Sequence, residues 1–259
     1  MQLAHASHAF VTGAASGIGL GIADALAGQG LCVTIADIDA EALDHVLGER
    51  DADFRGAVFD TRDRESWSRA KAEAEAAFGP VDVLVNNAGI SPNGREFADM
   101  DPDSFDRILQ INLVGIANGV FAFAADMRAR GTGHIVNTSS QAGLSTTVPG
   151  VGAYSVAKFG VTALSEGLRT EMEPHGVGVS CLIPGYVETN LGENTIKLGG
   201  DVRRYTGTMP KSDVTAADVG AMVVEGIEAN ASHIVTHAGA WRQSEKRFEQ
   251  IRTACALRE

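Results

Sequence analysis

The chain has 259 residues, of which 44% are hydrophobic and 7 are prolines, and this length and composition predict one folded domain spanning residues 1–259 without a linker. The formal net charge of -12 repels nucleic acid and anionic membranes, so we expect neither as a partner. No basic leader precedes the first motif, and we expect no apolar run long enough to span a bilayer.

The first predicted unit is a strand, a glycine-rich loop and a helix. Residues 9–12 form a short apolar run, and apolar residues recur at helical spacing from Leu20 to Leu26. The loop between them, with the spacing GxxxGxG, contains Gly13, Ser16, Gly17, Ile18 and Gly19. Glycines let the main chain approach a diphosphate closely, and the N-terminus of the following helix attracts the anion. The unit therefore predicts a phosphate-binding loop.

The second predicted strand, residues 31–36, is followed directly by Asp37. An acidic residue at this point of a nucleotide-binding βαβ unit accepts hydrogen bonds from the ribose hydroxyls and repels a 2'-phosphate. Ile38 follows where an NADP enzyme would be expected to carry an arginine or a lysine, and Ser16 in the glycine loop is neutral. These residues predict a preference for NAD over NADP.

Strand-like runs alternate with helical stretches along the whole chain. The runs lie near Phe10, Leu31, Ala57, Val81, Ile135, Val179 and Ile234. This alternation is typical of an α/β fold in which a doubly wound parallel sheet, here of about seven strands, carries helices on both faces. Ligands in such sheets bind beyond the carboxyl ends of the strands. The residues expected at those ends are Gly13, Asp37, Asp60, Asn87, Ser140 and Pro184.

Tyr154 and Lys158 lie four residues apart in a predicted helix, which places both side chains on one face. A neighbouring ammonium stabilises a phenolate, so we expect Lys158 to lower the pKa of Tyr154 from its ordinary value of about 10. A lower pKa brings the phenol closer to the range in which general acid-base catalysis is efficient. The pair therefore predicts a proton-transfer site.

Together these features resemble the short-chain dehydrogenase/reductase family, in its compact single-domain form with a Rossmann-like fold. The resemblance covers nearly the whole chain. Its motifs are the glycine loop, residues 86–89 (NNAG), Asn112 in LQINL, residues 135–140 (IVNTSS), the pair Tyr154 and Lys158, and residues 184–189 (PGYVET).

The resemblance implies contacts with a bound dinucleotide and no metal. Asn87, Ala88 and Gly89 correspond to the turn that passes close to the adenine ribose. Asp60 and Thr61 correspond to the pair that meets the adenine ring. The residues implied to shape the nicotinamide pocket are Pro184, Gly185, Val187 and Thr189.

The resemblance also implies the catalytic roles. Tyr154 would exchange a proton with the substrate, Lys158 would bind the nicotinamide ribose, and Ser140 would hydrogen-bond the substrate oxygen. Asn112 would hold a water near the lysine through a local break in its helix and so complete a proton relay. Ser140 is preferred over Ser139 because the family pattern puts this role on the second serine.

These roles predict an NAD-dependent oxidoreductase that interconverts a secondary alcohol and a ketone by hydride transfer. The phenolate of Tyr154 would take the hydroxyl proton, while Ser140 and Tyr154 bind the oxygen on which charge develops. The rival is a non-catalytic protein that senses NAD. It would be favoured if Ser140, Tyr154 or Lys158 were missing, and none is.

The segment 190–213 is expected to select the substrate. Its apolar residues are Leu191, Ile196, Leu198, Tyr205 and Met209, and its basic residues are Lys197, Arg203, Arg204 and Lys211. An apolar lid with basic edges and a solvated mobile loop are both compatible with this composition. The lid favours a hydrophobic small molecule, aromatic or alicyclic. Arg203, Arg204 and Lys211 leave a hydroxy acid or a 3-oxoacyl thioester as the alternative.

The last predicted helix covers residues 241–256 and offers Trp241, Phe248 and Ile251 for packing on the body or on another subunit. The resemblance implies a homotetramer or a homodimer built through the helices near residues 103–130 and 152–174. Small side chains in the second of these helices would permit close approach, namely Ala153, Ala157 and Gly160.

The cysteines and histidines form no metal-binding pattern. Cys32, Cys181 and Cys255 show no paired spacing, which fits a reducing compartment and predicts a cytoplasmic location. His233 and His237 lie four residues apart, but the stretch reads as strand and loop, so no metal site is predicted there.

Overall fold

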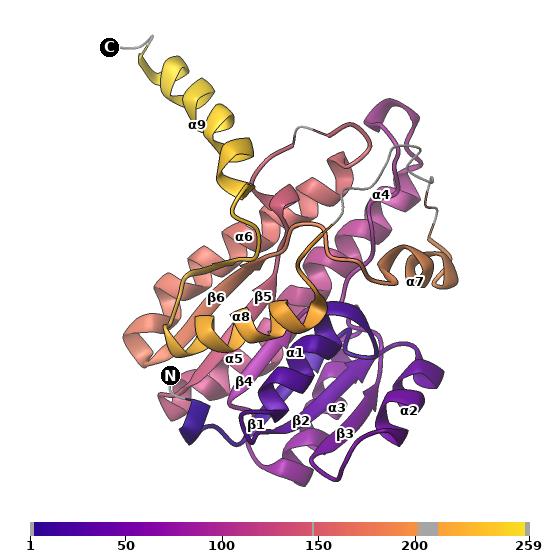
Figure 1. Cartoon of the computed structure of the whole chain (residues 1–259), viewed down its shortest axis with the longest axis vertical. Helices are drawn as coiled ribbons and strands as arrows, with labels where there is room; N and C mark the ends of the chain where they lie inside the picture. The colour runs from indigo at the N-terminus through magenta and orange to yellow at the C-terminus, as the bar shows by residue number, and fades with distance from the viewer. Residues whose placement is uncertain (1–2, 147, 201, 203–211, 257–259) are drawn as a thin grey trace.

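The structure is a computed structural model and describes residues 3–146, 148–200, 202 and 212–256. Within these residues the strands form one sheet in the order β3-β2-β1-β4-β5-β6-β7, and every neighbouring pair is parallel (Figure 1). The strands are β1 His8–Thr12, β2 Cys32–Asp37, β3 Phe54–Val58, β4 Val83–Asn86, β5 Gly133–Thr138, β6 Val177–Ile183 and β7 His233–Val235. The predicted doubly wound α/β fold is confirmed, and the strand order reverses between β1 and β4.

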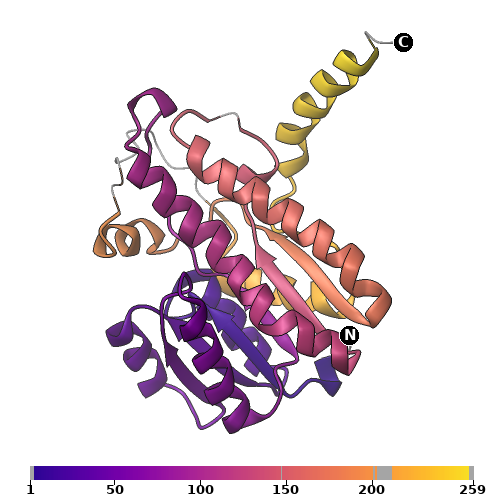
Figure 2. The same cartoon turned by 180° about the vertical axis from the view of Figure 1, so that it is seen from behind.

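Helices cover both faces of the sheet (Figures 1 and 2). They are α1 Gly17–Ala27, α2 Ala40–Gly48, α3 Arg64–Phe78, α4 Pro102–Leu109, α5 Gly115–Arg130, α6 Gly152–Met172, α7 Leu191–Lys197, α8 Ala216–Glu228 and α9 Ala240–Ala256. Short 3-10 turns span Leu3–His5, Phe97–Asp99, Gln141–Gly143 and Glu173–His175. Apolar side chains of α1, α2 and α8 pack on one face, and those of α3, α5 and α6 pack on the other.

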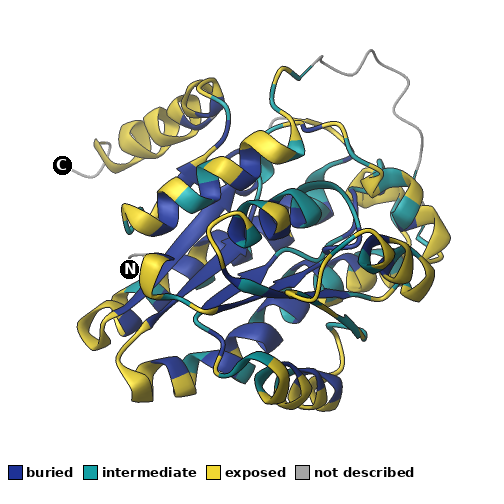
Figure 3. Cartoon of the chain, turned by 60° about the horizontal axis from the view of Figure 1, so that its bottom comes forward, coloured by how far each residue is buried: buried dark blue, intermediate teal, exposed yellow. Residues whose placement is uncertain are grey.

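The central strands are buried along their whole length (Figure 3). Because successive side chains of a strand point to opposite faces, Val11 and Val85 join the core beneath α1 and α8, while Phe10 and Leu84 join the core beneath α3 and α5. Burial on both faces explains why these strands read as continuous apolar runs. Since all the strands are parallel, their carboxyl ends meet at one edge of the sheet.

The helical run Pro102–Arg130 corrects one expectation. In the part of the chain that the structure describes, it is long and apolar enough to cross a membrane by length and composition, with a mean hydropathy of 1.7 over its most apolar window. The core helix of an α/β fold passes the same test, and here Val120, Phe123 and Met127 are buried in the core cluster that includes β4 and β5. The expectation that no such run exists was therefore wrong.

The structure describes the predicted loop 190–213 only in part, whereas it describes the predicted last helix almost completely. The predicted loop 190–213 contains a helix, α7, and its residues Arg203, Arg204, Tyr205, Met209 and Lys211 lie outside the described residues. The predicted last helix is present as α9, and it projects away from the body (Figures 1 and 3). Of its apolar residues, Trp241 is 60% exposed and Phe248 is 50% exposed, so neither is covered by the body.

Candidate active site

The glycine loop connects β1 to the N-terminus of α1, and its shape requires glycine. Gly13 and Gly17 have φ angles of 63° and 56°, in the left-handed region that side chains disfavour. A Cβ on Gly13 would lie 2.8 Å from the Cα of Ala88, and a Cβ on Gly19 would lie 2.1 Å from the main-chain oxygen of Gly13. The loop therefore keeps a bare main chain at the positive end of a helix.

A second turn, after β4, is tied to this loop. Thr12 Oγ1 accepts hydrogen bonds from the main-chain N–H groups of Asn87 at 3.0 Å and Ala88 at 3.1 Å. In return, Asn87 Nδ2 donates to the main-chain oxygen of Thr12 at 3.1 Å. The strand reversal between β1 and β4 thus brings the two predicted motifs into one rigid unit.

The carboxylate of Asp37 is held at the end of β2. Its Oδ2 accepts from the N–H of Ala15 at 3.1 Å, and its Oδ1 accepts from the N–H of Asp39 at 3.1 Å. A carboxylate oxygen has two acceptor sites, so each oxygen keeps one for a further donor such as a ribose hydroxyl. The fixed carboxylate fits the role predicted from the sequence.

Lys197 lines a small cavity together with Asp37, and no sequence motif indicates this. A small cavity of about 230 Å³ is lined by Asp37, Ile38, Asp39, Asn194, Lys197 and Leu198. Lys197 comes from α7, far along the chain from Asp37, and no local pattern links the two residues. Its position bears on the discrimination between NAD and NADP, because a lysine there can offset the repulsion of a phosphate.

Asp60 and Thr61 follow β3 and line the same cleft as Asp37. Arg62 forms an ion pair with Asp60, and hydrogen bonding by this guanidinium lowers the pKa of the Asp60 carboxyl. Asp60 is therefore ionised, and its implied contact with the adenine ring stays a prediction.

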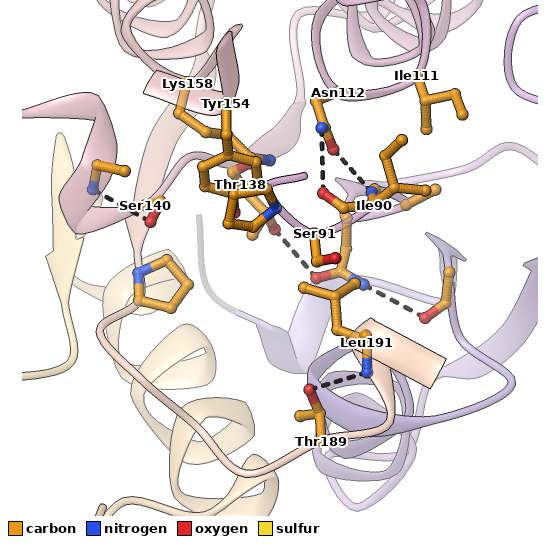
Figure 4. A pocket seen from close by; sticks show the side chains of 18 of the residues that line it. Ile90, Ser91, Ile111, Asn112, Thr138, Ser140, Tyr154, Lys158, Thr189 and Leu191 are labelled. Atoms are coloured by element: carbon orange, nitrogen blue, oxygen red, sulfur yellow. Dashed lines mark hydrogen bonds between the residues drawn. The ribbon is translucent and has the colours of Figure 1, made fainter. Parts of the chain in front are cut away.

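The catalytic end of the cleft lies between β5 and α6. Tyr154 and Lys158 project from the first turns of α6, and Ser140 follows the end of β5 (Figure 4). Lys158 is 2% exposed, and its Nζ donates to the main-chain oxygen of Thr138 at 2.8 Å. The same Nζ lies 5.6 Å from the centre of the Tyr154 ring. The predicted pair thus shares one site.

The pKa expectation for this pair is wrong in direction. Burial raises the pKa of Tyr154 to about 12, and the hydrogen bond with Ser140 only partly opposes this. Burial also lowers the pKa of Lys158 to about 8. Loss of solvation in the cleft disfavours the phenolate more than the neighbouring Ser140 hydroxyl favours it. The phenol therefore keeps its proton at neutral pH in this structure.

The two serines point to opposite sides of the chain. Ser139 is buried, and its Oγ donates to the main-chain oxygen of Lys158 at 2.9 Å. Ser140 lines the cleft together with Tyr154, and its Oγ accepts from the N–H of Ala142 at 3.2 Å. The geometry agrees with the choice of Ser140 as the residue facing a substrate oxygen.

Asn112 lies in a π-helical turn, Gln110–Val114, between α4 and α5, so the expected break in its helix is present. Its Oδ1 accepts from the N–H of Ile90 at 2.9 Å and its Nδ2 donates to the oxygen of Ile90 at 3.1 Å (Figure 4). These two bonds fix the side chain against Ile90. Its implied role with a water molecule stays a prediction.

Helix α7 is fastened over the cleft by three distant residues. Asn194 Nδ2 donates to Ser16 Oγ at 3.2 Å, and the N–H of Ser91 donates to Thr195 Oγ1 at 3.0 Å. Arg107 donates to the main-chain oxygen of Leu198 at 3.0 Å. The segment after the last predicted motif thus contributes Leu191, Asn194 and Leu198 to the lining of the cleft.

One cleft of about 1080 Å³ contains nearly all the predicted site residues. Gly19 is the exception, because it lies behind the loop against Gly13. The predicted residues lining the cleft are Gly13, Ser16, Gly17, Ile18, Asp37, Ile38, Asp60, Thr61, Asn87, Ala88, Gly89, Asn112, Ser140, Tyr154, Lys158, Pro184, Gly185, Val187 and Thr189. A glycine cradle at a helix N-terminus, with an oriented carboxylate beyond it, fits a dinucleotide.

Apolar side chains also line the cleft, and several of them, such as Ile90, Pro92 and Val148, stand in no sequence motif. They include Ile90, Pro92, Ile111, Val148, Pro149, Val151 and Leu191. Leu191 belongs to the segment expected to select the substrate, whereas Ile90 and Ile111 come from turns whose position depends on the folded sheet.

Comparison with known proteins gives one consistent family. The model of the family described as short chain dehydrogenase matches residues 7–197. The C alpha-dehydrogenase of Sphingobium sp. (strain NBRC 103272 / SYK-6) is 32% identical over 260 residues, which cover 94% of this chain and 84% of that protein.

Solved structures agree. A short chain dehydrogenase/reductase from Burkholderia phymatum, in complex with NAD, has a TM-score of 0.88 and 27% identity, covering 98% of this chain and 97% of that one. A variant of the actinorhodin polyketide ketoreductase with NADPH has a TM-score of 0.79 and 29% identity, covering 93% of this chain and 99% of that one. Similar folds therefore accompany both nicotinamide cofactors.

Proposed function

The chain belongs to the short-chain dehydrogenase family of oxidoreductases, and from this premise we propose that it uses NAD to interconvert a secondary alcohol and a ketone. The observation that carries the proposal is the meeting of Ser140, Tyr154 and Lys158 in the cleft that also holds the glycine loop and Asp37. When bound, the nicotinamide would accept or supply the hydride.

The protein's own residues bind the substrate oxygen and transfer the proton to or from it. The hydroxyl groups of Ser140 and Tyr154 bind the substrate oxygen, on which negative charge develops during ketone reduction. A phenol with a pKa of about 12 holds its proton at neutral pH and is ready to donate it to that oxygen. Alcohol oxidation needs the phenolate, and Lys158, whose Nζ lies 5.6 Å from the centre of the ring, is the cation placed to stabilise it when the proton leaves.

The substrate is proposed to be hydrophobic, with an aromatic or alicyclic body. The apolar side chains around Ser140 and Tyr154 support this choice because they favour apolar surface over charge. The residues that argued for a hydroxy acid or thioester, Arg203, Arg204 and Lys211, lie outside the described residues.

Replacing Tyr154 by phenylalanine tests the reaction. We expect Tyr154→Phe to bind NADH like the natural protein, because the ring remains, while turnover of secondary alcohols falls by about 10²- to 10⁴-fold, the usual contribution of a general acid-base group. Turnover is measured by the absorbance of the reduced nicotinamide. Equal turnover of the two proteins would remove the phenol from the mechanism, and no turnover in either protein would favour a non-catalytic protein that senses NAD.

The preference for NAD over NADP is tested by replacing the two charged residues Asp37 and Lys197, which line the small cavity. We expect NADH to bind more tightly than NADPH, and Asp37→Ala to narrow the difference because the carboxylate no longer repels a 2'-phosphate. Lys197→Ala is the matched change of opposite charge and should widen the difference. Titration of protein fluorescence with each cofactor measures the affinities. An equal preference in the natural protein would contradict the assignment.

The remaining proposals concern location and assembly. We place the protein in the cytoplasm, on the absence of paired cysteine spacing in the sequence. We also propose a homodimer or homotetramer as its working form.

A further inference from the structure

A chain of hydrogen bonds runs behind the wall of the cleft at Gly185. The N–H of Gly185 donates to Thr236 Oγ1 at 3.1 Å and to His237 Nδ1 at 3.2 Å. Thr236 Oγ1 and His237 Nδ1 are themselves 2.7 Å apart. On the far side of the ring, His237 Nε2 lies 3.3 Å from Ser212 Oγ, which donates to the main-chain oxygen of Val214 at 3.0 Å. None of the sequence motifs includes the side chains of Thr236, His237 or Ser212.

The direction of each bond follows from one fixed donor. A main-chain N–H can only donate, so Nδ1 of His237 must be an acceptor and carries no proton. The Thr236 hydroxyl, which accepts from Gly185, is the group placed to donate to Nδ1. With Nδ1 as an acceptor, Nε2 is the ring nitrogen that donates to Ser212. The hydrogen bonds through His237 and Ser212 therefore all donate in one direction, from the N–H of Gly185 to the main-chain oxygen of Val214.

The packing around the ring is tight. A Cβ on Gly185 would lie 2.6 Å from His237 Nδ1, so the imidazole lies directly against this main chain. Thr236 is buried and continues the pairing of β7 with β6, because its N–H donates to the oxygen of Ile183 at 3.4 Å. Gly185 lines the cleft, whereas His237 does not.

We propose that His237 is a positioning residue that fixes the Gly185 N–H, and with it the cleft wall on which the nicotinamide ring is to rest. This rests on the proposed function, since only a nicotinamide enzyme has a hydride to align. Ser212 anchors the ring from the segment that leads into α8, and Thr236 transmits its orientation to Gly185. A small misplacement of a reacting group costs much rate, so a loosened wall lowers turnover more than it lowers cofactor affinity.

The test compares two replacements of His237. His237→Asn keeps an acceptor close to the place of Nδ1, and His237→Leu removes it. We expect His237→Leu to lower kcat about tenfold or more, the factor that corresponds to one lost net hydrogen bond, with the Kd for NADH changed less than about threefold. His237→Asn should restore kcat to within about threefold of the natural value. Equal kcat for His237→Leu and the natural protein, or no rescue by His237→Asn, would overturn the proposal.

A control and a second readout separate positioning from folding and from the proposed function. His233→Leu changes a histidine on the adjoining strand β7 whose ring lies near Ser232 and Glu166, and its kcat should stay unchanged. The fluorescence lifetime of bound NADH reports on the ring without turnover. It should shorten in His237→Leu and recover in His237→Asn.

The pattern of failure identifies which idea is wrong. If the fluorescence lifetime of bound NADH is the same in the natural protein, His237→Leu and His237→Asn, the positioning role is wrong, even if turnover follows the proposed function. Loss of turnover in Tyr154→Phe with no effect in His237→Leu would leave the function standing and reject the positioning role. A natural protein that binds no NADH would reject both.

Discussion

Two histidines are buried in the sheet in their neutral form. His134 in β5 is fully buried, its Nε2 lies 2.8 Å from Ser180 Oγ, and burial lowers its pKa to about 3. His8 in β1 contacts Gly79 and Thr34 through its two ring nitrogens, and burial lowers its pKa as well. Both rings stay neutral in the folded protein at pH values where the unfolded chain protonates them.

Acid should therefore destabilise the protein below about pH 6.5, the ordinary histidine pKa. In that range the unfolded state binds more protons than the folded state, so the free energy of unfolding falls as pH falls. The slope is up to about 1.4 kcal/mol per pH unit for His134, continuing toward its folded pKa of about 3. Urea unfolding at about pH 7.5, 6.5 and 5.5 measures it.

Carboxylates do not account for a loss of stability between about pH 6.5 and pH 5.5. Asp60, Asp63 and Asp218 also have lowered pKa values, so their contribution to stability is lost only as pH falls below their ordinary value of 3.8. A free energy of unfolding that stays constant from about pH 6.5 to 5.5 would contradict the assignment to the histidines.

At the scale of helices and strands, close packing of α5 on the sheet depends on Gly119. A Cβ there would lie 2.0 Å from Asn86 Oδ1 and 2.8 Å from the ring of Trp67, which are both buried. We expect Gly119→Ala to lower the free energy of unfolding by about 1–3 kcal/mol, the usual cost of overpacking a core. Chemical denaturation measures the change.

The matched control is Gly167→Ala in α6, where an added Cβ meets no atom within 4 Å. Alanine is the better helix former, so this change should raise the free energy of unfolding by about 0.5–1 kcal/mol. Equal changes in the free energy of unfolding for the two substitutions would show that helix propensity, rather than the contact with Asn86, determines the effect of Gly119→Ala.

Most elements were predictable because local sequence determines them. Buried strands such as β1 and β6 are continuous apolar runs, and the glycine loop and α1 follow the first of them directly. Helix α7 was not predicted because residues 191–197 carry little apolar pattern. Its position depends on Ser16, Ser91 and Arg107, which are distant in the chain.

The same reason separates the site residues that were predicted from those that were not. Ser140, Tyr154 and Asp37 stand in motifs whose spacing reveals them. Lys197 and His237 reach the surroundings of the cleft only through folding, and the spacing of His237 from His233 suggests nothing beyond a metal ligand, which the strand context disfavours. Burial of Tyr154 raises its pKa, and this burial likewise depends on residues from several parts of the chain that form the cleft.

At the scale of the whole molecule, α5 and α6 lie side by side on one flank (Figure 2). Phe121 of α5 is 66% exposed and Val156 of α6 is 45% exposed. Each of these helices thus exposes a large apolar side chain, and the proposed homodimer or homotetramer would cover both of them.

Replacing Phe121 by glutamate should therefore shift the protein toward the monomer mass of 27.1 kDa, because a charge cannot be buried without a partner. Analytical ultracentrifugation gives the mass of each protein. Val58→Glu is the control, since Val58 is also exposed but lies on the edge strand β3. A monomeric natural protein, or a Phe121→Glu variant with its mass unchanged, would refute the interface.

The projecting α9 has a practical consequence for spectroscopy. Cys255 near its end is exposed, Cys32 is half-buried and Cys181 is buried. A maleimide dye would thus react first at the tip of this arm, without any engineered thiol. Its depolarisation would follow the swing of the arm separately from the tumbling of the body to which it is attached.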